Sequence, residues 1–335
     1  MKLALTFYSV LKMPMHDIIS CAVAAEKAGF KYISMAESFY RDAFVLATAI
    51  AGQTTKVKYG SSIIPIHTRT PFQIAMATAT FNEFSNGRVG FIGLGVGYRS
   101  RIEKFFGVKM ENSLSKMREY VQIIRGLLSG NDFTYQGKFY NFQSFPRLVT
   151  QPLKVPILFG SSGCKMLRLA GEIADGVVLN SIGTPQYYKH VLSVLFGAAQ
   201  EAGRSKNDYE IASSIIFSVA DKYEDAINAA RHDVLFYLLY PELDPVIEKT
   251  PYMDKVIKIR KVHAKGKIND ALSMISDNMV DDLAICGNTK ECRQKIRKLF
   301  RYGITLPIIR VSVQPLKEKE RKGAFMTAIK SLAAL

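Results

Sequence analysis

The sequence of 335 residues has no tryptophan, only four cysteines and no long apolar run. A membrane-spanning helix needs about 18 consecutive apolar residues, and the start of the chain suits a strand better than a signal peptide. We therefore expect a cytoplasmic protein with no membrane partner. The four cysteines form no CxxC pair, and the five histidines are scattered. These spacings predict reduced, buried thiols and no metal site.

Acidic residues are scarce as well, because 29 Asp and Glu face 45 Lys and Arg, for a net charge of +16. The basic excess is spread along the chain and forms no basic arm. Such charge can attract nucleic acid or an anionic small molecule, or it can simply be a solvated surface. No RNP, helix-turn-helix or zinc-finger pattern is present, so we expect no nucleic-acid partner. An anionic cofactor or substrate and a solvated surface both stay open.

Short β-branched stretches alternate with helical patterns along the whole chain. Eight strands are expected, at residues 3–8, 31–35, 57–64, 88–94, 155–159, 176–179, 211–219 and 304–311. Parallel strands need helical crossovers, and eight such units favour an α/β fold of the (β/α)8 or TIM-barrel type over a doubly wound sheet. No linker divides the chain, so we predict one domain over residues 1–335. Two excursions, 130–152 and 222–282, follow the fourth and seventh strands and are expected to shape the substrate pocket.

The clearest unit covers residues 57–101. Thr70 stands where a helix N-cap belongs and Pro71 where the first helical residue belongs. Asn86-Gly87 closes that helix, and the next strand runs into a glycine-rich segment that includes Gly95. Polar residues and glycines thus gather where strands end. In parallel α/β proteins this is the side on which ligands bind.

Four groups at strand ends could carry chemistry. Glu37 follows the second strand and could hydrogen-bond a ligand or move a proton, or it could pair with Arg41. The loop Gly160-Ser161-Ser162-Gly163 lies between a strand and a helix, which suits a phosphate or an ordinary serine-capped helix. The glycines around Gly95 permit close approach of a ligand or form a tight turn. His67, beyond the third strand, is a ligand donor or a satisfied loop residue.

Several stretches together resemble the luciferase-like flavin and deazaflavin oxidoreductase family. They are AESFYRDAF at 36–44, TRTPFQIAMATATFNEFSNGR at 68–88, GLGVGYRSRIEKFFGV at 93–108, FGSSGCKMLRLAGEIADGVVLNS at 159–181 and CGNTKECRQKIRKLFRYGI at 286–304. The resemblance covers nearly the whole chain in the right order. It implies an enzyme with a (β/α)8 barrel, usually a homodimer, that holds FMN or coenzyme F420 at the C-terminal mouth.

The resemblance also implies where a cofactor would sit. A bulge after the third strand, often with a cis non-proline peptide, would back the ring, and by position this is Ser62–Ile63. The 160–163 loop would hold the phosphate. The predicted catalytic residue is Glu37, and the predicted cofactor-binding residues are Ser62, Ile63, Ile64, Gly95, Gly160, Ser161, Ser162, Gly163, Asn180 and Ser181.

The segment ESFYRD at 37–42 is more like the deazaflavin-using branch, which includes methylenetetrahydromethanopterin reductase. Two features of that branch are absent: Glu37-Ser38 replaces an Asp-His pair, and Thr6-Phe7-Tyr8 has no acid at the end of the first strand. We predict hydride transfer between coenzyme F420 and an unidentified small organic substrate. The alternatives are an FMN-dependent monooxygenase that uses reduced flavin and oxygen, and a cofactor-free ligand-binding barrel.

Overall fold

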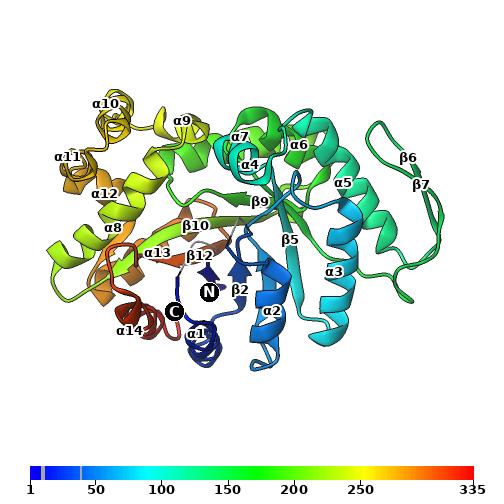
Figure 1. The fold of residues 1–335 in the computed structure, drawn as a ribbon, viewed down its shortest axis with the longest axis horizontal. Helices are drawn as coiled ribbons and strands as arrows, with labels where there is room; N and C mark the ends of the chain where they lie inside the picture. The colour runs from blue at the N-terminus through cyan, green and yellow to red at the C-terminus, as the bar shows by residue number, and fades with distance from the viewer. Residues whose placement is uncertain (9–11, 38–39) are drawn as a thin grey trace.

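The computed structural model describes residues 1–8, 12–37 and 40–335. Its centre is a closed ring of eight parallel strands (Figure 1). In order around the ring they are β1 (Ala4–Phe7), β2 (Tyr32–Met35), β3 (Lys58–Ser61), β5 (Val89–Gly95), β8 (Ile157–Gly160), β9 (Gly176–Leu179), β10 (Glu210–Val219) and β12 (Leu306–Val311). The pairing of β12 with β1 closes the ring. The predicted (β/α)8 barrel is therefore confirmed.

Helices surround the barrel and bury their apolar faces against it. They are α1 (Met15–Lys27), α2 (Ala43–Ala51), α3 (Pro71–Phe84), α5 (Ser113–Leu127), α6 (Cys164–Ile173), α7 (Pro185–Glu201), α13 (Thr289–Arg301) and α14 (Glu318–Ser331). The predicted start of α3 is confirmed, because the Thr70 hydroxyl accepts the Gln73 N–H group and Pro71 is the first helical residue. None of the helices in the described part of the chain is long and apolar enough to cross a membrane.

The two excursions lie on different sides of the barrel (Figure 1). The first contains an antiparallel hairpin, β6 (Phe133–Gln136) and β7 (Asn141–Phe145), which stands outside α5. The second contains α8 (Tyr223–Leu238), η2 (Pro241–Leu243), α9 (Asp244–Ile247), α10 (Met253–Ala264), α11 (Ile268–Ser273), α12 (Asp277–Leu283) and the short strand β11 (Ile285–Gly287). Because β11 pairs with the end of β10, the second excursion stays close to the carboxyl ends of the strands.

The predicted elements differ from the structure at two places near those ends. The third strand stops at Ser61, and the chain re-forms a pairing with β5 only at β4 (Ile64–Pro65). A helix that we did not predict, α4 (Arg99–Phe106), follows β5. Its only buried residue is Ile102, and its N-cap makes no side-chain hydrogen bond. The sequence offered no cap signal, and its apolar residues at helical spacing, Ile102, Phe105 and Phe106, are mostly exposed apart from Ile102.

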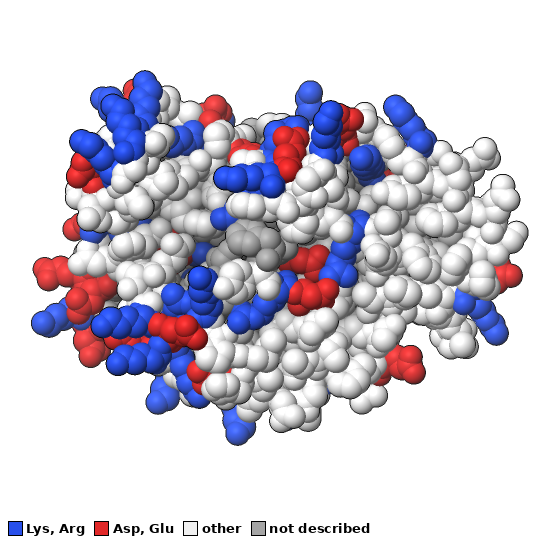
Figure 2. Space-filling view, in the orientation of Figure 1, with Lys and Arg blue, Asp and Glu red and all other residues white. Residues whose placement is uncertain are grey.

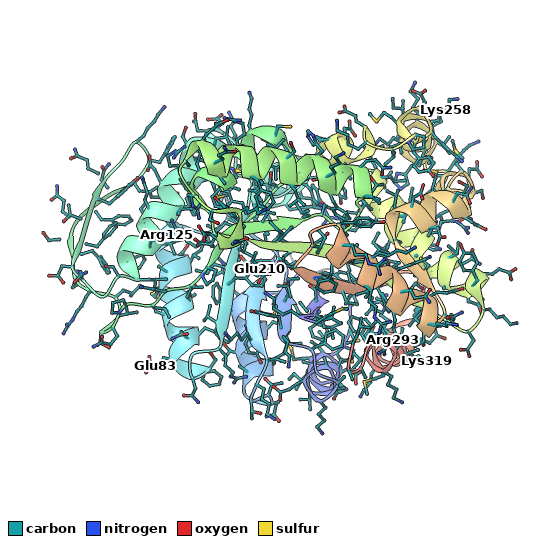
Figure 3. The ribbon with its side chains drawn as sticks, turned by 180° about the vertical axis from the view of Figure 1, so that it is seen from behind. Glu83, Arg125, Glu210, Lys258, Arg293 and Lys319 are labelled. Carbon is teal, nitrogen blue, oxygen red and sulfur yellow. The ribbon has the colours of Figure 1, made fainter. Side chains whose placement is uncertain are left out.

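The basic excess has no single location on the folded chain. Figure 2 shows Lys and Arg side chains mixed with Asp and Glu over one face. Figure 3, seen from behind, places Lys258 of α10 and Arg293 of α13 on separate parts of the surface. The thiols differ from the expectation in one case. Cys164 is exposed with its Sγ 3.5 Å from His190 Nε2, whereas the other three cysteines are buried.

Candidate active site

A cavity of about 690 Å³ lies at the carboxyl ends of the barrel strands. Ten of the predicted site residues line it together: Glu37, Ser62, Ile63, Gly95, Gly160, Ser161, Ser162, Gly163, Asn180 and Ser181. Ile64 is the exception, because it is fully buried in the apolar core and does not line the cavity. The structure thus places Ile64 outside the cavity lining, and its predicted role in cofactor binding stays a prediction.

One wall of the cavity is formed by Ile63 together with two glycines from neighbouring strands. A cis peptide bond joins Ser62 and Ile63, at the position that the resemblance implied. The Ile63 carbonyl accepts the Glu37 N–H group at 3.0 Å, and the Ser62 N–H group donates to the Met35 carbonyl at 2.7 Å. The segment between β3 and β4 is thus held by the end of β2.

Glycine is needed in this wall because of the Ile63 side chain. A Cβ atom at Gly95 would lie 2.7 Å from Ile63 Cδ1, and one at Gly160 would lie 2.8 Å from Ile63 Cγ2. One position earlier in β5, a Cβ at Gly93 would lie 1.8 Å from the Ser61 carbonyl oxygen. We call Ile63, Gly95 and Gly160 the glycine wall. Neither alternative for the glycine motif described this packing, although Gly95 does face the cavity.

The loop at 160–163 ends in a helix terminus without a side-chain cap. Gly163 is the N-cap of α6, and no side chain accepts the first N–H groups of that helix. The Ser161 hydroxyl donates to the Gly163 carbonyl at 3.3 Å, and the Ser162 hydroxyl donates to the Glu242 carbonyl at 3.1 Å. The alternative of a serine-capped helix is therefore wrong. Open N–H groups at the start of a helix suit an anion, and Lys165 of the same turn lines the cavity.

Glu37 is engaged by neighbours in the protein. The Arg69 guanidinium donates to both of its oxygens, at 2.6 and 2.8 Å, and the Ala43 N–H group donates to Oε2 at 3.1 Å. Burial alone would lower the pKa of Arg69, but hydrogen bonds and charge from Glu37 and Asp42 raise it overall. Arg41, the partner considered from the sequence, donates to the Met13 carbonyl at 2.6 Å. Glu37 thus belongs to an ion pair at the cavity edge.

Asn180 and Ser181 are joined to a hydroxyl network. The Asn180 side-chain amide donates to the Tyr98 hydroxyl at 2.9 Å. The Ser181 hydroxyl donates to the Tyr237 hydroxyl at 2.7 Å and shares a hydrogen bond with Ser214 at 2.7 Å. Burial raises the pKa of Tyr98, which keeps its phenol protonated. These residues fix the shape of the cavity below the 160–163 loop.

The second excursion covers the cavity, and the first does not. Phe236 and Tyr237 of α8 and Leu243 of η2 line it. Tyr240 stacks on Tyr98 with ring centroids 4.1 Å apart, so the aromatic cover is tied to the end of β5. No residue of the hairpin excursion, 130–152, appears in the lining of the cavity. The prediction that both excursions shape the pocket is therefore wrong for the hairpin, which packs outside α5.

The sequence analysis missed one group of cavity residues. They come from strands on the other side of the barrel and from α8, and they are Thr6, Tyr8, Ser214, Tyr237 and Arg310. The available signal was a single charge, because Arg310 stands inside an otherwise apolar strand and is only 2% exposed. Within the described ranges, no three His, Cys, Asp or Glu side chains gather as a metal site.

Comparisons with known proteins agree with this geometry. A family model described as luciferase-like monooxygenase matches residues 5–306. The chain is 29% identical over 313 residues to 5,10-methylenetetrahydromethanopterin reductase of Methanolobus tindarius, covering 92% of this chain and 94% of that one. The solved coenzyme F420-dependent tetrahydromethanopterin reductase of Methanopyrus kandleri superposes with a TM-score of 0.85 at 24% identity, covering 98% and 97%. An FMN complex of the oxygenating constituent of 3,6-diketocamphane monooxygenase from Pseudomonas putida superposes with a TM-score of 0.69 at 19% sequence identity. This match covers 99% of this chain and 98% of that one.

Proposed function

Because the chain belongs to the luciferase-like monooxygenase family and is an enzyme, we propose that it transfers a hydride between coenzyme F420 and a small organic substrate. A curated relative named as a reductase and a solved structure named as coenzyme F420-dependent support this cofactor. The FMN complex of a solved monooxygenase keeps FMN as the alternative. The cytoplasmic location stays a prediction.

The observation that carries the proposal is the pairing of two features in one cavity. The glycine wall offers an apolar surface in which the Ile63 side chain lies against Gly95 and Gly160, and the uncapped start of α6 offers N–H groups for an anion. A planar ring with a phosphorylated tail needs both. Ile63 would back the ring, and Ser161 and Gly163 would hold the phosphate. When bound, the cofactor would supply the hydride, and the protein would contribute binding, orientation and exclusion of water.

Glu37 is better suited to positioning than to proton transfer. Its carboxylate already accepts two hydrogen bonds from Arg69 and one from Ala43, and its side chain is 8% exposed. Its own N–H group holds the Ile63 carbonyl. We therefore propose that Glu37 fixes the segment that carries Ile63 at the cavity edge, in place of the catalytic role expected from the sequence.

Titration of the purified protein with F420 and with FMN tests the cofactor. We expect saturable F420 binding and weaker FMN binding, followed by fluorescence. Gly163→Asp should abolish F420 binding, because position 163 has open space for a side chain and the new carboxylate would repel the phosphate. Gly197→Asp is the matched control, since Gly197 is exposed, also has open space and lies in α7 away from the cavity.

The two alternatives make different predictions in the same titration. Tight FMN binding without F420 binding would support the FMN-dependent monooxygenase. F420 affinity that survives Gly163→Asp would contradict the phosphate site. Failure of both cofactors to bind, with a small ligand still bound in the cavity, would support a cofactor-free ligand-binding barrel.

We also propose that the protein is a homodimer. The α2 helix contains no charged residue, and Val45 of α2 is 64% exposed while Phe84 at the end of α3 is 52% exposed. Figure 2 shows a mostly uncharged surface over these two helices. An exposed apolar patch of this kind is typical of an interface between copies. Val45→Glu should convert a dimer to a monomer in light scattering, and a monomeric wild-type protein would contradict the proposal.

A further inference from the structure

Opposite the glycine wall, the cavity is lined by polar side chains. The strand order β12-β1-β2-β3-β5 places β12 four positions from β5 in a ring of eight. Thr6 and Tyr8, from the end of β1, and Arg310, from β12, line the cavity on that side. We call these three residues the arginine wall. A ring that rests on the glycine wall would turn its open face toward them.

Arg310 is buried and makes a side-chain hydrogen bond to only one residue, Asp233, of the described part of the chain. One guanidinium nitrogen donates to the Asp233 carboxylate behind it. Its Cζ atom lies 4.1 Å from the centroid of the Tyr8 ring and 5.0 Å from that of Tyr237. A guanidinium has five N–H donors, and the other donors of Arg310 have no hydrogen-bond partner among the described residues. Buried donors without partners are costly unless a ligand or water accepts from them.

Two hydroxyl groups near Arg310, those of Thr6 and Tyr8, also have no hydrogen-bond partner among residues 1–8, 12–37 and 40–335. Thr6 is only 3% exposed, and its Oγ1 makes no hydrogen bond in the described structure. The Tyr8 hydroxyl likewise has no hydrogen bond to any residue of the described ranges. Burial raises the pKa of Tyr8, so its phenol stays protonated and able to donate. The arginine wall therefore presents several donors and no charged acceptor to the cavity.

We propose that Thr6, Tyr8 and Arg310 form a subsite for a neutral oxygen acceptor of the substrate, of which a carbonyl oxygen is the simplest example. The acceptor is neutral because Asp233, fully buried and also bonded by the Gln314 amide at 2.9 Å, compensates the charge of Arg310. A cationic substrate group would meet donors only. This inference rests on the proposed function for its placement of the substrate opposite the cofactor.

Three probes of one shape test the subsite. Cyclohexanone, cyclohexanecarboxylate and cyclohexylammonium share a six-membered ring and differ in the polar group. Each is titrated against the full-length protein, with and without F420, by ligand-observed NMR. We expect cyclohexanone to bind at least about fivefold more tightly than either charged probe, which corresponds to about one hydrogen bond.

The Thr6→Val variant makes the test specific, because it keeps the side-chain shape and removes only the unpartnered hydroxyl. Cyclohexanone affinity should fall about 2- to 10-fold while the melting temperature does not decrease. Thr78→Val is the matched control. Thr78 in α3 is also fully buried with an unpartnered hydroxyl, but it does not line the cavity, so probe affinity should not change.

Tyr8→Phe removes the second hydroxyl and should weaken cyclohexanone binding by a similar factor. The subsite is contradicted by equal binding of the three probes, by preference for the carboxylate, by no binding at the highest soluble probe concentration, or by an unchanged affinity in Thr6→Val. If F420 fails to bind but cyclohexanone binding remains selective and sensitive to Thr6→Val, the cofactor proposal fails and the subsite stands. If F420 binds and the probes show no selectivity, the subsite proposal fails and the cofactor proposal stands.

Discussion

The two sides of the cavity, the glycine wall and the arginine wall, are built from different parts of the chain and suit different ligand groups. The glycine wall is shaped by backbone and by missing side chains, because Gly95 and Gly160 leave room for Ile63. The arginine wall is made of polar side chains whose charge is balanced from behind by Asp233. An apolar surface with tightly packed neighbours suits a planar ring that must be held in place. A set of open donors suits the group that distinguishes one substrate from another.

The difference also concerns how each wall is stabilised. Tight packing holds the glycine wall, so added volume should damage it. The ion pair between Arg310 and Asp233 stabilises the arginine wall, so removal of either partner should destabilise it. Each substitution below perturbs one wall of the cavity and is chosen to leave the other wall unchanged. The expected effects are ordered from the largest to the smallest.

Asp233→Ala should give the largest effect, because it leaves the Arg310 charge buried without its partner. Arg310 is 2% exposed and Asp233 is fully buried. Breaking such a pair costs about 3–5 kcal/mol in the free energy of unfolding, measured by urea denaturation. The control is Glu201→Ala at the pair with Arg168, whose side chains are 50% and 62% exposed, where about 0–1 kcal/mol is expected. Equal losses in the two variants would show that Arg310 does not depend on Asp233.

Gly93→Ala should destabilise the strand beneath the glycine wall. The new Cβ would lie 1.8 Å from the Ser61 carbonyl oxygen, and backbone cannot move aside as a side chain can. We expect a loss of about 1–3 kcal/mol or more in the free energy of unfolding. Gly163→Ala has open space and a φ of −95°, so its stability should change little. A stable Gly93→Ala variant would mean that β3 and β5 are farther apart than described.

Gly95→Ala should act through Ile63 and spare the arginine wall. The added Cβ would meet the end of the Ile63 side chain, which can rotate away at modest cost. We expect about tenfold weaker F420 binding, or about 1.4 kcal/mol, with unchanged cyclohexanone affinity in the cofactor-free protein. In an Ile63→Ala background the clash disappears, so Gly95→Ala should cost no further stability. A double-mutant cycle measures this coupling, and an additive result would contradict the packing.

The contrast between the walls explains what the sequence could predict. Thr70 and Pro71 signal a helix start within two residues, and the strand–helix units follow from local periodicity. The glycine motif at 93–97 marked the right strand, although its physical reason, contact with Ser61 and Ile63, involves residues some thirty positions earlier in the chain. Local patterns thus located the barrel and the glycines of the glycine wall, whereas the position of Ile63 followed only from the family resemblance.

The arginine wall could not be found in this way. Thr6, Tyr8 and Arg310 come from the two ends of the chain, and Asp233 lies in an excursion between them. No spacing rule connects positions that meet only when β12 pairs with β1. Glu37 shows the same limit. Its expected partner was four residues away, and its actual partner, Arg69, is 32 residues away, after the neighbouring strand β3.

The smallest effect concerns His67, which lies just beyond β4 next to the glycine wall. Its Nε2 is 3.1 Å from the Ser113 hydroxyl, and Ser113 lines the cavity. Burial, with nearby Lys116 and Arg99, lowers the pKa of His67 below 6.5. The unfolded chain therefore binds a proton at a higher pH than the folded chain. Stability from neutral His67 is fully present above pH 6.5 and is lost as the pH falls through the folded-state pKa.

His67→Gln should reduce this loss of stability on acidification, measured by urea denaturation from pH 7 to pH 5, and the gain should be below the ~1–3 kcal/mol of a steric clash. His232→Gln is the control, because burial lowers the pKa of His232 in the same direction. Neither histidine lines the cavity itself, but within the described ranges only His67 is hydrogen-bonded to a residue that does, Ser113. Both variants should flatten the pH dependence of stability, but only His67→Gln should also flatten the pH dependence of F420 affinity. If F420 affinity keeps its acid sensitivity in His67→Gln, the loop after β4 supports the fold and not the glycine wall, and the wall then depends on packing alone.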